Sequence, residues 1–201
     1  MQLVVATRNR KKIEEIKRIL QGVPVELFTL ADFPGCPEVV EDAGSFRGNA
    51  MKKASAVAHF TKKPALSDDS GLEVYALNGA PGVLSARYAG EEADDRRNLA
   101  KLLSEMQGVE EGRRGARFVC YLALAFPDGR GKTFKGSAEG RIGRKPRGSH
   151  GFGYDPVFYP EGHERTFAEM TSDEKNALSH RGKALGKFKE YMAKLACEEH
   201  V

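Results

Sequence analysis

The chain has 201 residues, the length of one ordinary domain, and we expect a single domain that spans residues 1–201. Hydrophobic residues make up 40% of the chain and charged residues 30%, which is a globular rather than a disordered composition. The formal net charge of +4 suits a phosphate-bearing small molecule as ligand, but it is too weak to establish nucleic-acid binding.

Cysteine usage and the amino-terminal sequence bear on the compartment. Cys36, Cys120 and Cys197 are widely spaced and form no C-x-x-C pair, so neither a zinc ribbon nor a disulfide framework is expected. The first residues are mostly apolar and basic residues follow them, the reverse of a secretory signal, and no apolar run is long enough to span a membrane. We therefore expect a cytoplasmic protein with neither membrane nor nucleic acid as a partner.

The first third of the chain alternates short apolar runs with helical patterns. Residues 3–6 form a continuous apolar run, which is typical of a buried strand, and residues 25–30 predict a second strand. Between them, residues 13–20 have apolar positions at helical spacing, and Asn9 is a suitable N-cap for this helix. The next helix ends before Pro64 and has its apolar face on Phe46, Ala50, Ala54 and Val57.

An acidic tetrad interrupts the apolar pattern that follows. Two strands, 65–67 and 72–75, are expected on either side of Asp68-Asp69-Ser70-Gly71. Residues 76–90 are rich in Gly and Pro and predict an ordered loop. Asp94 then caps a third helix, whose apolar positions are Leu99, Leu102, Leu103 and Met106.

The last part of the chain predicts a hairpin and a long helix. Residues 116–126 are apolar at both alternating sets of positions, which is typical of a central strand covered on both faces. The turn at 127–129 leads into a half-exposed strand near 133–139, and the capping box at 171–174 opens a long C-terminal helix. These elements predict an α/β fold with a central twisted mixed β-sheet and flanking helices.

The polar connection from Thr7 to Lys12 is the first candidate site. It joins a strand to a helix, so free amides and the positive end of the helix dipole favour an anion there, and Lys12 adds a charge that suits a phosphate. The glycines of a Walker A loop are missing. An ordinary solvated helix start explains the same residues, and the local sequence alone favours this interpretation over a phosphate site.

Two acidic pairs form the second candidate site. Asp68 and Asp69 repel each other, and a hard cation or a shared proton is the simplest way to keep both at a strand end. A metal would also lower the pKa of a bound water, whose proton a neighbouring carboxylate could accept. An Asx-type turn is the structural alternative. Glu41 and Asp42 precede a helix, where they would either complete a cation site or act as ordinary caps.

The loop 148–156 is the third candidate site. Its glycines let a ligand approach the backbone, and Phe152 and Tyr154 offer flat faces for a base. A tight loop with buried aromatic rings is the alternative, but the density of glycine and aromatic residues favours a binding loop.

The predicted C-terminal helix holds the fourth candidate site. Arg181 projects from its apolar stripe, with Lys175 and His180 beside it, so three donors gather at one end of the helix. A buried guanidinium needs an acceptor, which is either a structural carboxylate or an acceptor-rich ligand.

These motifs, in this order, resemble the non-canonical purine nucleoside triphosphate pyrophosphatases, also called the inosine triphosphate pyrophosphatase family. The matching segments cover nearly the whole chain: Thr7-x-Asn9-x-x-Lys12, Glu41-Asp42-x-Gly44, Asp68-Asp69-Ser70-Gly71-Leu72, Gly79-x-Pro81-Gly82 with Ser85-Ala86-Arg87-Tyr88, Gly151-Phe152-Gly153-Tyr154-Asp155-Pro156, and Glu174-Lys175-Asn176 with Ser179-His180-Arg181. The resemblance implies an elongated two-lobed domain around a long active-site cleft, usually as a homodimer. It also implies Mg²⁺-dependent hydrolysis of ITP, dITP and XTP to the monophosphate and pyrophosphate, which removes deaminated purines from the nucleotide pool.

The same resemblance implies a role for each matching residue. Thr7, Asn9 and Lys12 would contact the triphosphate, with the additional charges of Arg8, Arg10 and Lys11 beside them. Glu41 and Asp69 would hold Mg²⁺, Asp69 would also accept the proton of the attacking water, and Asp68 would support it. Ser70 would touch the substrate, Phe152 would stack on the purine, and Gly153, Tyr154 and Asp155 would shape its pocket. Lys175, His180 and Arg181 would address the base edge.

The sequence departs from the family pattern at two places. Arg8 stands where a small residue is common, and Glu41-Asp42-Ala43-Gly44 stands where Glu-Glu-Thr-Gly is common. The second departure leaves open which of Glu41 and Asp42 reaches the metal, and we expect Glu41.

Other functions remain as alternatives. A Maf-like pyrophosphatase acting on other modified nucleotides, or a phosphatase, would differ in substrate or in releasing orthophosphate. The basic stretch 141–147 is also compatible with a nucleotide- or RNA-binding module, for which salt-sensitive RNA binding without turnover would be the evidence.

Overall fold

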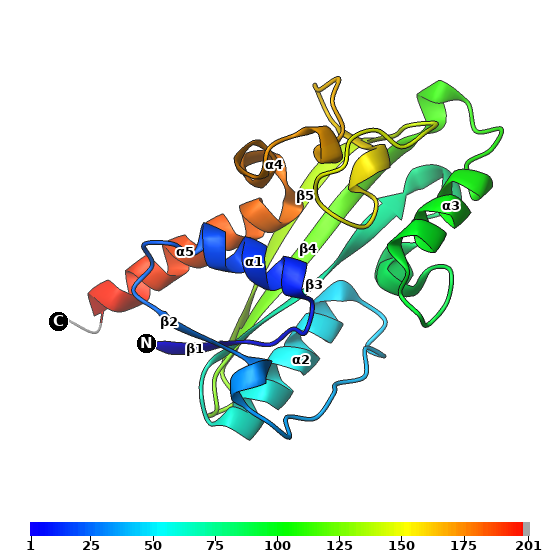
Figure 1. The fold of residues 1–201 in the computed structure, drawn as a ribbon. Coiled ribbons are helices and arrows are strands. Elements are labelled where there is room, and N and C mark those ends of the chain that lie inside the picture. The colour runs from blue at the N-terminus through cyan, green and yellow to red at the C-terminus, as the bar shows by residue number, and fades with distance from the viewer. Residues whose placement is uncertain (199–201) are drawn as a thin grey trace. The chain divides into compact units, whose positions relative to one another are not determined.

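The computed structural model describes residues 1–198, in which strands and α-helices alternate as far as α3 and three strands and two helices then follow (Figure 1). The strands are β1 (Gln2–Val5), β2 (Glu26–Thr29), β3 (Ala65–Val74), β4 (Gly115–Ala125), β5 (Gly131–Ile142) and β6 (Phe158–Pro160). The α-helices are α1 (Arg10–Ile19), α2 (Phe46–Thr61), α3 (Asp95–Glu105), α4 (Ser172–Leu178) and α5 (His180–Glu198). Short 3₁₀ helices at Tyr75–Leu77 and Gly82–Arg87 occupy much of the predicted ordered loop.

The strands form one mixed sheet in the order β2-β1-β3-β4-β5-β6. β1 runs parallel to β2, with Val4 opposite Phe28, and parallel to β3, with Val5 opposite Leu66. β5 and β6 are antiparallel. β4 and β5 are neighbours joined by a tight turn, in which the Phe126 amide donates to the carbonyl of Arg130 at 2.8 Å. The predicted mixed α/β sheet is therefore confirmed.

The chain folds into two compact units. Unit 1 comprises Met1–Asp69, Cys120–Gly136 and the residues from Lys183 onward, and unit 2 comprises Ser70–Val119 and Ser137–Gly182. β3, β4, β5 and α5 each begin in one unit and end in the other. Asp69 is the last residue of β3 in unit 1, and Ser70 is the first in unit 2.

Unit 1 is built around β1, whose side chains alternate between two apolar cores. Leu3 and Val5 pack into a core with α1 and α5, whereas Val4 packs into a second core with α2 on the opposite side of the strand (Figure 1). Both faces of β1 are covered, which explains why its apolar run has no polar alternation and confirms the predicted buried strand. Helical residues of these cores include Ile16, Ala50, Ala54, Val57, Leu185 and Phe188, and the C-cap residue of α1, Leu20, packs with them.

Unit 2 has an aromatic core. The Phe118 ring on β4 lies 4.7 Å from the ring centroid of Phe158 and 6.1 Å from that of Phe167. Leu102 and Met106 attach α3 to this core, as the helical spacing predicted. Burying each such side chain stabilises the fold by roughly 1.5–3 kcal/mol, so α3 has a firm anchor at its C-terminal half.

The predicted helix caps are present. Asn9 accepts a hydrogen bond from the Lys12 amide at 3.2 Å, and Asp94 accepts one from the Arg97 amide at 2.9 Å. Thr171 and Glu174 form the reciprocal capping box. Each cap supplies a partner for an amide that the first helical turn leaves unpaired.

The prediction of two short strands around the acidic tetrad is wrong. β3 is continuous from Ala65 to Val74, so Asp68 and Asp69 lie inside a strand and not in an Asx-type turn. The strand continues because lysine side chains of unit 1 contact both carboxylates, and no turn is needed to bring them to water.

The prediction of one long C-terminal helix from the capping box is also wrong. The box opens only the short α4, which ends at Ser179, where the backbone is extended with ψ 154°. The Ser179 hydroxyl then accepts a hydrogen bond from the Gly182 amide at 3.0 Å at the start of α5. A Cβ on Gly182 would lie 1.8 Å from the carbonyl oxygen of Asn176, so the tight junction between the helices requires glycine there.

Cys36 and Cys120 are buried and form no disulfide bond, and the side chain of Cys197 lies outside the described residues. Among residues 1–198, no helix combines the length and the apolar character that crossing a membrane requires.

Candidate active site

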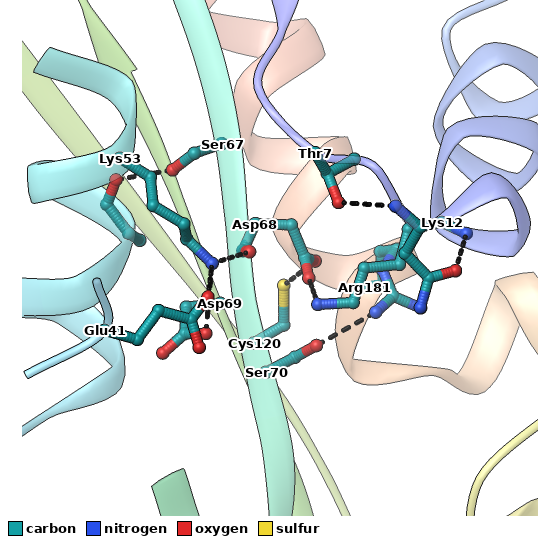
Figure 2. A network of polar contacts seen from close by, with 12 residues as sticks. Thr7, Lys12, Glu41, Lys53, Ser67, Asp68, Asp69, Ser70, Cys120 and Arg181 are labelled. Atoms are coloured by element: carbon teal, nitrogen blue, oxygen red, sulfur yellow. Dashed lines mark hydrogen bonds and ion pairs between the residues drawn. The ribbon is translucent and has the colours of Figure 1, made fainter. Parts of the chain in front are cut away.

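The connection between β1 and α1 positions Lys12. The Thr7 hydroxyl accepts a hydrogen bond from the Asn9 amide at 3.2 Å, and Asn9 in turn caps α1. Lys12 thus lies in the first turn of the helix, at the positive end of the helix dipole. Its ammonium forms an ion pair with Asp68, whose side chain is fully buried on β3 (Figure 2).

Asp68 is held by two elements of unit 1. Its Oδ1 contacts the Lys12 ammonium, and its Oδ2 accepts a hydrogen bond from the Cys120 thiol on β4 at 3.1 Å. A buried carboxylate requires partners of this kind. A carboxylate that is removed from water and gains no partner in exchange destabilises the fold by several kcal/mol. Asp68 is therefore fixed in one orientation beside Lys12.

Lys53 on α2 lies among three oxygen atoms (Figure 2). Its Nζ is 2.5 Å from Glu41 Oε1, 2.9 Å from the carbonyl oxygen of Asp68 and 3.2 Å from Asp69 Oδ1. Asp42 instead pairs with Lys52 at the surface. Glu41 and Asp69 consequently share one cation, and Asp42 is outside this group.

Two buried polar side chains hold α2 and the loop before it. The Ser67 hydroxyl on β3 donates to the carbonyl of Ala50 at 2.5 Å, and Asn49 Oδ1 accepts from the Ala43 amide at 2.9 Å. Both bonds are buried or partly buried, so they tie Lys53 and the Glu41 loop to the strand that carries Asp69.

The environment shifts the proton affinity of this group. Burial raises the pKa of Asp69, which Lys53 opposes and Glu41 reinforces. Burial would lower the pKa of Lys53, but the charges of Asp69 and Glu41 outweigh it and raise the pKa of the ammonium. A charged lysine next to a carboxylate with a raised pKa is an arrangement in which that carboxylate can accept a proton.

The carboxylates also fit a divalent cation. Oδ2 of Asp69 is buried and meets no hydrogen-bond donor among the described residues. Mg²⁺ prefers carboxylate oxygens and keeps several water or phosphate ligands, so it needs only one or two protein carboxylates. Nowhere in residues 1–198 do three or more His, Cys, Asp or Glu side chains gather as a metal site. Glu41 and Asp69 therefore fit Mg²⁺ as a two-carboxylate site and not as a closed protein cage.

Basic residues of the first connection border this group. Arg8 donates to the carbonyl of Cys36 at 2.9 Å, while Arg10 and Lys11 are exposed in the first turn of α1. A cavity of about 130 Å³ in unit 1 is lined in part by Thr7, Arg8, Glu41 and Lys53. The phosphate-binding segment predicted from the sequence thus reaches the carboxylates through Thr7, Arg8 and Lys12.

Unit 2 gathers the residues predicted to bind a base. Lys175 on α4 is buried, with its Nζ 2.7 Å from Asp155 Oδ2 and 5.0 Å from the ring centroid of Phe152. The same Asp155 oxygen accepts a hydrogen bond from the Phe152 amide at 2.9 Å. Asp155 thus orders the loop and pairs with the lysine, so the ring and the cation are positioned together.

Arg181 is the second buried cation of this group. It is 2% exposed, its Nη2 donates to the Ser70 hydroxyl at 2.9 Å, and its Cζ is 5.6 Å from the centroid of the Phe152 ring. Figure 2 shows this contact between α5 and β3 within unit 2. Arg181 therefore lies beside both Ser70 and the Phe152 ring.

The remaining predicted residues contact the core of unit 2. The His180 ring is buried and stacks on Phe118 at 4.7 Å, and the Tyr154 hydroxyl donates to the carbonyl of Ser85 at 2.8 Å. Burial raises the pKa of Tyr154 above that of an ordinary tyrosine. Gly153, between Phe152 and Tyr154, has a φ of +60° in the left-handed region.

Comparison with protein families places the chain. The model of the Ham1 family matches residues 3–191, which is nearly the whole chain. This chain belongs to the Ham1 family.

Relatives of this Ham1-family chain are similar over their full length. A protein of Desulforamulus reducens named dITP/XTP pyrophosphatase is 50% identical over 201 residues, covering 100% of both chains. A protein of Geobacter sulfurreducens with the same name is 52% identical and covers 95% of this chain and 96% of the other. The Maf-like and RNA-binding alternatives gain no support from these matches.

Solved structures of Ham1 proteins have the same fold. A HAM1 protein from Coxiella burnetii is 39% identical with a TM-score of 0.89, over 96% of this chain and 99% of that one. A structure from Mycobacterium abscessus, titled nucleoside-triphosphatase / dITP/XTP pyrophosphatase, is 47% identical with a TM-score of 0.78, over 94% of this chain and 98% of the other.

Lys53 is the residue of this Ham1-family site that the sequence analysis missed. The helical pattern of α2 shows its apolar face at Ala50, Ala54 and Val57, and a lysine next to that face is typically solvated. The available signal is its position: Lys53 lies three residues after the buried Ala50 and immediately before the buried Ala54, at the edge of the inward face.

Proposed function

We propose that this chain is a hydrolase that cleaves the non-canonical purine nucleoside triphosphates dITP, XTP and ITP to the nucleoside monophosphate and pyrophosphate. Full-length relatives at about 50% identity are named dITP/XTP pyrophosphatases, and the two clusters described above suit the two ends of such a nucleotide. The reaction would be attack of water at the α-phosphorus with pyrophosphate as leaving group. The product distinguishes it from a phosphatase, which releases orthophosphate.

The phosphate end of the nucleotide would be bound in unit 1. Lys12 and Lys53 present ammonium groups, and Thr7 and Asn9 precede a helix N-terminus whose dipole favours anions. Fixed positive charges stabilise the charge that develops on phosphoryl oxygens in the transition state. This supports a role for unit 1 in both binding and charge stabilisation.

Mg²⁺ would be held by Glu41 and Asp69, the pair that shares Lys53 in this structure. When bound, the ion supplies charge neutralisation on the phosphate oxygens and lowers the pKa of coordinated water. Asp69 would accept the proton of the attacking water, for which its raised pKa is suited. Asp68, fixed by Lys12 and Cys120, would hold Lys12 in place and not act as the base.

The base end of the nucleotide would be bound in unit 2, with Phe152 stacking on the purine. Lys175 and Arg181 are donors beside that ring. Hypoxanthine and xanthine present an acceptor oxygen at position six, whereas adenine presents a donor amine that would leave a buried cation unpaired. A buried donor left without an acceptor weakens binding by about 1–3 kcal/mol. This corresponds to roughly tenfold to a few hundredfold discrimination against adenine per contact.

The observation that carries the proposal is the position of Asp69 and Ser70. They are consecutive residues of β3, and Asp69 belongs to the carboxylate and lysine group while Ser70 is hydrogen-bonded to Arg181. β3 therefore supplies one residue to the group suited to phosphate chemistry and the next residue to the group suited to a purine.

Pyrophosphate release from dITP, XTP, ATP and GTP, with Mg²⁺ or with EDTA, tests the proposal. We expect release from dITP and XTP that EDTA abolishes, and at least tenfold slower release from ATP. Asp69→Asn should abolish turnover with the fold intact by circular dichroism, because the amide cannot accept the proton. Asp42→Asn, which removes an exposed neighbouring carboxylate outside the group, should stay near wild type. Equal activity of the Asp69→Asn variant and the wild-type protein would exclude Asp69 as the base.

Two further expectations belong to this proposal. The homodimer follows from the family resemblance, and the cytoplasmic location follows from the cysteine usage and the amino-terminal sequence; both stay predictions. Sedimentation of the purified chain would give its oligomeric state.

A further inference from the structure

The loop that carries Phe152 is held by a carboxylate from another element. The Gly153 amide donates to Asp95 Oδ2 at 2.9 Å, across 58 residues of sequence. Asp95 is the first residue of α3, and it lies outside the motifs that the sequence shares with the family. Gly153 immediately follows Phe152, so this bond acts next to the ring proposed to stack on the purine.

The root of the loop is fixed by backbone hydrogen bonds. The Gly143 amide donates to the carbonyl of Val157 at 2.7 Å, and the Arg147 amide to that of Pro156 at 2.8 Å. These bonds close the loop where it leaves and rejoins unit 2. Before Phe152, the Ser149 and His150 amides also donate to the carbonyl of Ala168, at 3.1 and 3.0 Å, so the loop is tied to unit 2 on that side. The position of the Phe152 ring then depends on the contacts that follow it in the chain.

Near the tip, two carboxylates have different effects. Asp155 accepts from the Phe152 amide and pairs with Lys175 of α4, so it fixes the shape of the turn and ties it to α4. Asp95 belongs to α3, which is anchored in the core of unit 2 by Leu102 and Met106. A contact to a rigid element outside the loop fixes where the turn lies and not only its shape.

The start of α3 is itself well defined. Asp94 caps the helix by accepting from the Arg97 amide at 2.9 Å, so the backbone of Asp95 is in the first helical turn. A charged acceptor also makes a shorter and stronger hydrogen bond to an amide than a neutral one. Asp95 is thus an anchored, charged acceptor aimed at the residue after Phe152.

We propose that Asp95 is a positioning residue, which holds the Gly153 amide and thereby keeps the Phe152 ring in place for the purine. The proposal rests on the proposed function for the identity of the ligand, but the placement of the ring is a property of the free protein. Loss of the bond weakens nucleotide binding and leaves the chemical step, which belongs to unit 1, nearly unchanged.

Steady-state kinetics on dITP test whether Asp95 acts by placing a hydrogen-bond acceptor at the Gly153 amide or only through its negative charge. Asp95→Ala should raise KM roughly three- to tenfold with kcat within about twofold, as expected for losing one charge-assisted hydrogen bond. Asp95→Asn keeps an acceptor at the same place and should restore KM to within about twofold of wild type. Asp94→Asn removes the adjacent charge and keeps the cap, so it should match wild type. A KM for Asp95→Asn as high as for Asp95→Ala, or an equal rise in Asp94→Asn, would overturn the proposal.

A second measurement does not depend on turnover. The chain has no Trp, so Phe152→Trp introduces a single fluorescent reporter at the ring position. In this background Asp95→Ala should raise the acrylamide quenching constant at least twofold, and Asp94→Asn should leave it unchanged. Equal quenching in the three proteins, or a reporter as accessible in the folded parent as in urea, contradicts the positioning role. If dITP is not hydrolysed but quenching rises, the proposed function fails and the positioning of the loop by Asp95 stands.

Discussion

Gly151 and Gly162 have the same backbone φ of +75° but different surroundings. A Cβ on Gly151 would lie 2.0 Å from Asp155 Oδ2, the oxygen that binds both Phe152 and Lys175. A Cβ on Gly162 would meet nothing within 4 Å. Substituting each glycine by alanine therefore distinguishes two effects. Both substitutions place a side chain on a left-handed backbone, but only the one at Gly151 also displaces Asp155.

Gly162→Ala should lower the free energy of unfolding by about 1–2 kcal/mol, the cost of a side chain in the left-handed region. Gly151→Ala should lower it by more, because its Cβ also displaces the buried Asp155 from Lys175. Only Gly151→Ala should also lower kcat/KM on dITP, roughly tenfold or more, because it displaces the acceptor shared by Phe152 and Lys175. Urea unfolding and initial rates of the two variants check this. Equal kcat/KM in both would show that the Asp155 contacts do not support the site.

At the residue scale, the sequence predicted the members of the site better than their contacts. Asp68, Asp69 and Arg181 stood out because charges in apolar surroundings demand partners, and the structure places a partner at each. Lys53 did not stand out, because its role depends on the Asp68 carbonyl oxygen and the Asp69 carboxylate of β3, which are 15 and 16 residues away. Periodicity identifies the buried face of a helix, but it does not show which distant charges that face meets.

At the scale of elements, α4 is stabilised by its capping box. Glu174 accepts hydrogen bonds from the Thr171 amide at 2.8 Å and from Arg165 Nη2 at 2.7 Å. Arg165 and Thr171 together lower the pKa of Glu174 to about 2, from an ordinary value of 4.5. Because the folded-state pKa is depressed, the contribution of Glu174 to stability is fully present above its ordinary value and is lost as the pH falls through about 2.

Glu174→Gln should therefore destabilise the protein at pH 6 and have progressively less effect as the pH is lowered from about 4.5 towards about 2. Urea unfolding of wild type and variant at about pH 6, 4 and 3 measures the difference across that range. Arg165→Gln keeps the Glu174 carboxylate and removes its cation. The pH dependence of the unfolding free energy of this variant should therefore lie between those of the wild type and of Glu174→Gln. A difference between wild type and Glu174→Gln that stays constant over this range would contradict the assignment.

Element boundaries were predictable where local chemistry decides them. Asn9, Asp94 and Thr171 cap helices with their own side chains, and each cap was predicted correctly. β3 was divided wrongly because an acidic pair normally ends a strand, and only the distant lysines allow it to continue. α4 and α5 were merged because the break at Ser179 depends on the close approach of Gly182 to Asn176, which no periodicity shows.

At the scale of the whole molecule, the chain passes repeatedly between the two units. Unit 1 is made of three separate segments and unit 2 of two, and β3, β4, β5 and α5 are shared. Neither unit is therefore a continuous piece of sequence that can be cut out. This connectivity supports the expectation of a single domain, because unfolding one unit breaks strands and a helix that belong to the other.

We expect the two units to unfold in one transition. Tyr191 packs on the core of unit 1 with Lys132 over its ring at 4.1 Å, and Tyr88 packs on the core of unit 2 with Lys101 over its ring at 4.3 Å. Tyr191→Trp and Tyr88→Trp place a single tryptophan at matched positions in a chain that has none, so each reports its own unit. Both variants should give the same urea midpoint.

A core substitution in one unit makes this prediction sharper. Leu66→Ala empties a fully buried site in unit 1 and should lower the free energy of unfolding by about 2–5 kcal/mol. If the units unfold together, the midpoint from the Tyr88→Trp reporter in unit 2 falls as far as that from the Tyr191→Trp reporter in unit 1. A shift confined to the unit 1 reporter, or two midpoints without the core substitution, would mean that each unit is stable while the other is unfolded, and the single-domain prediction would be wrong.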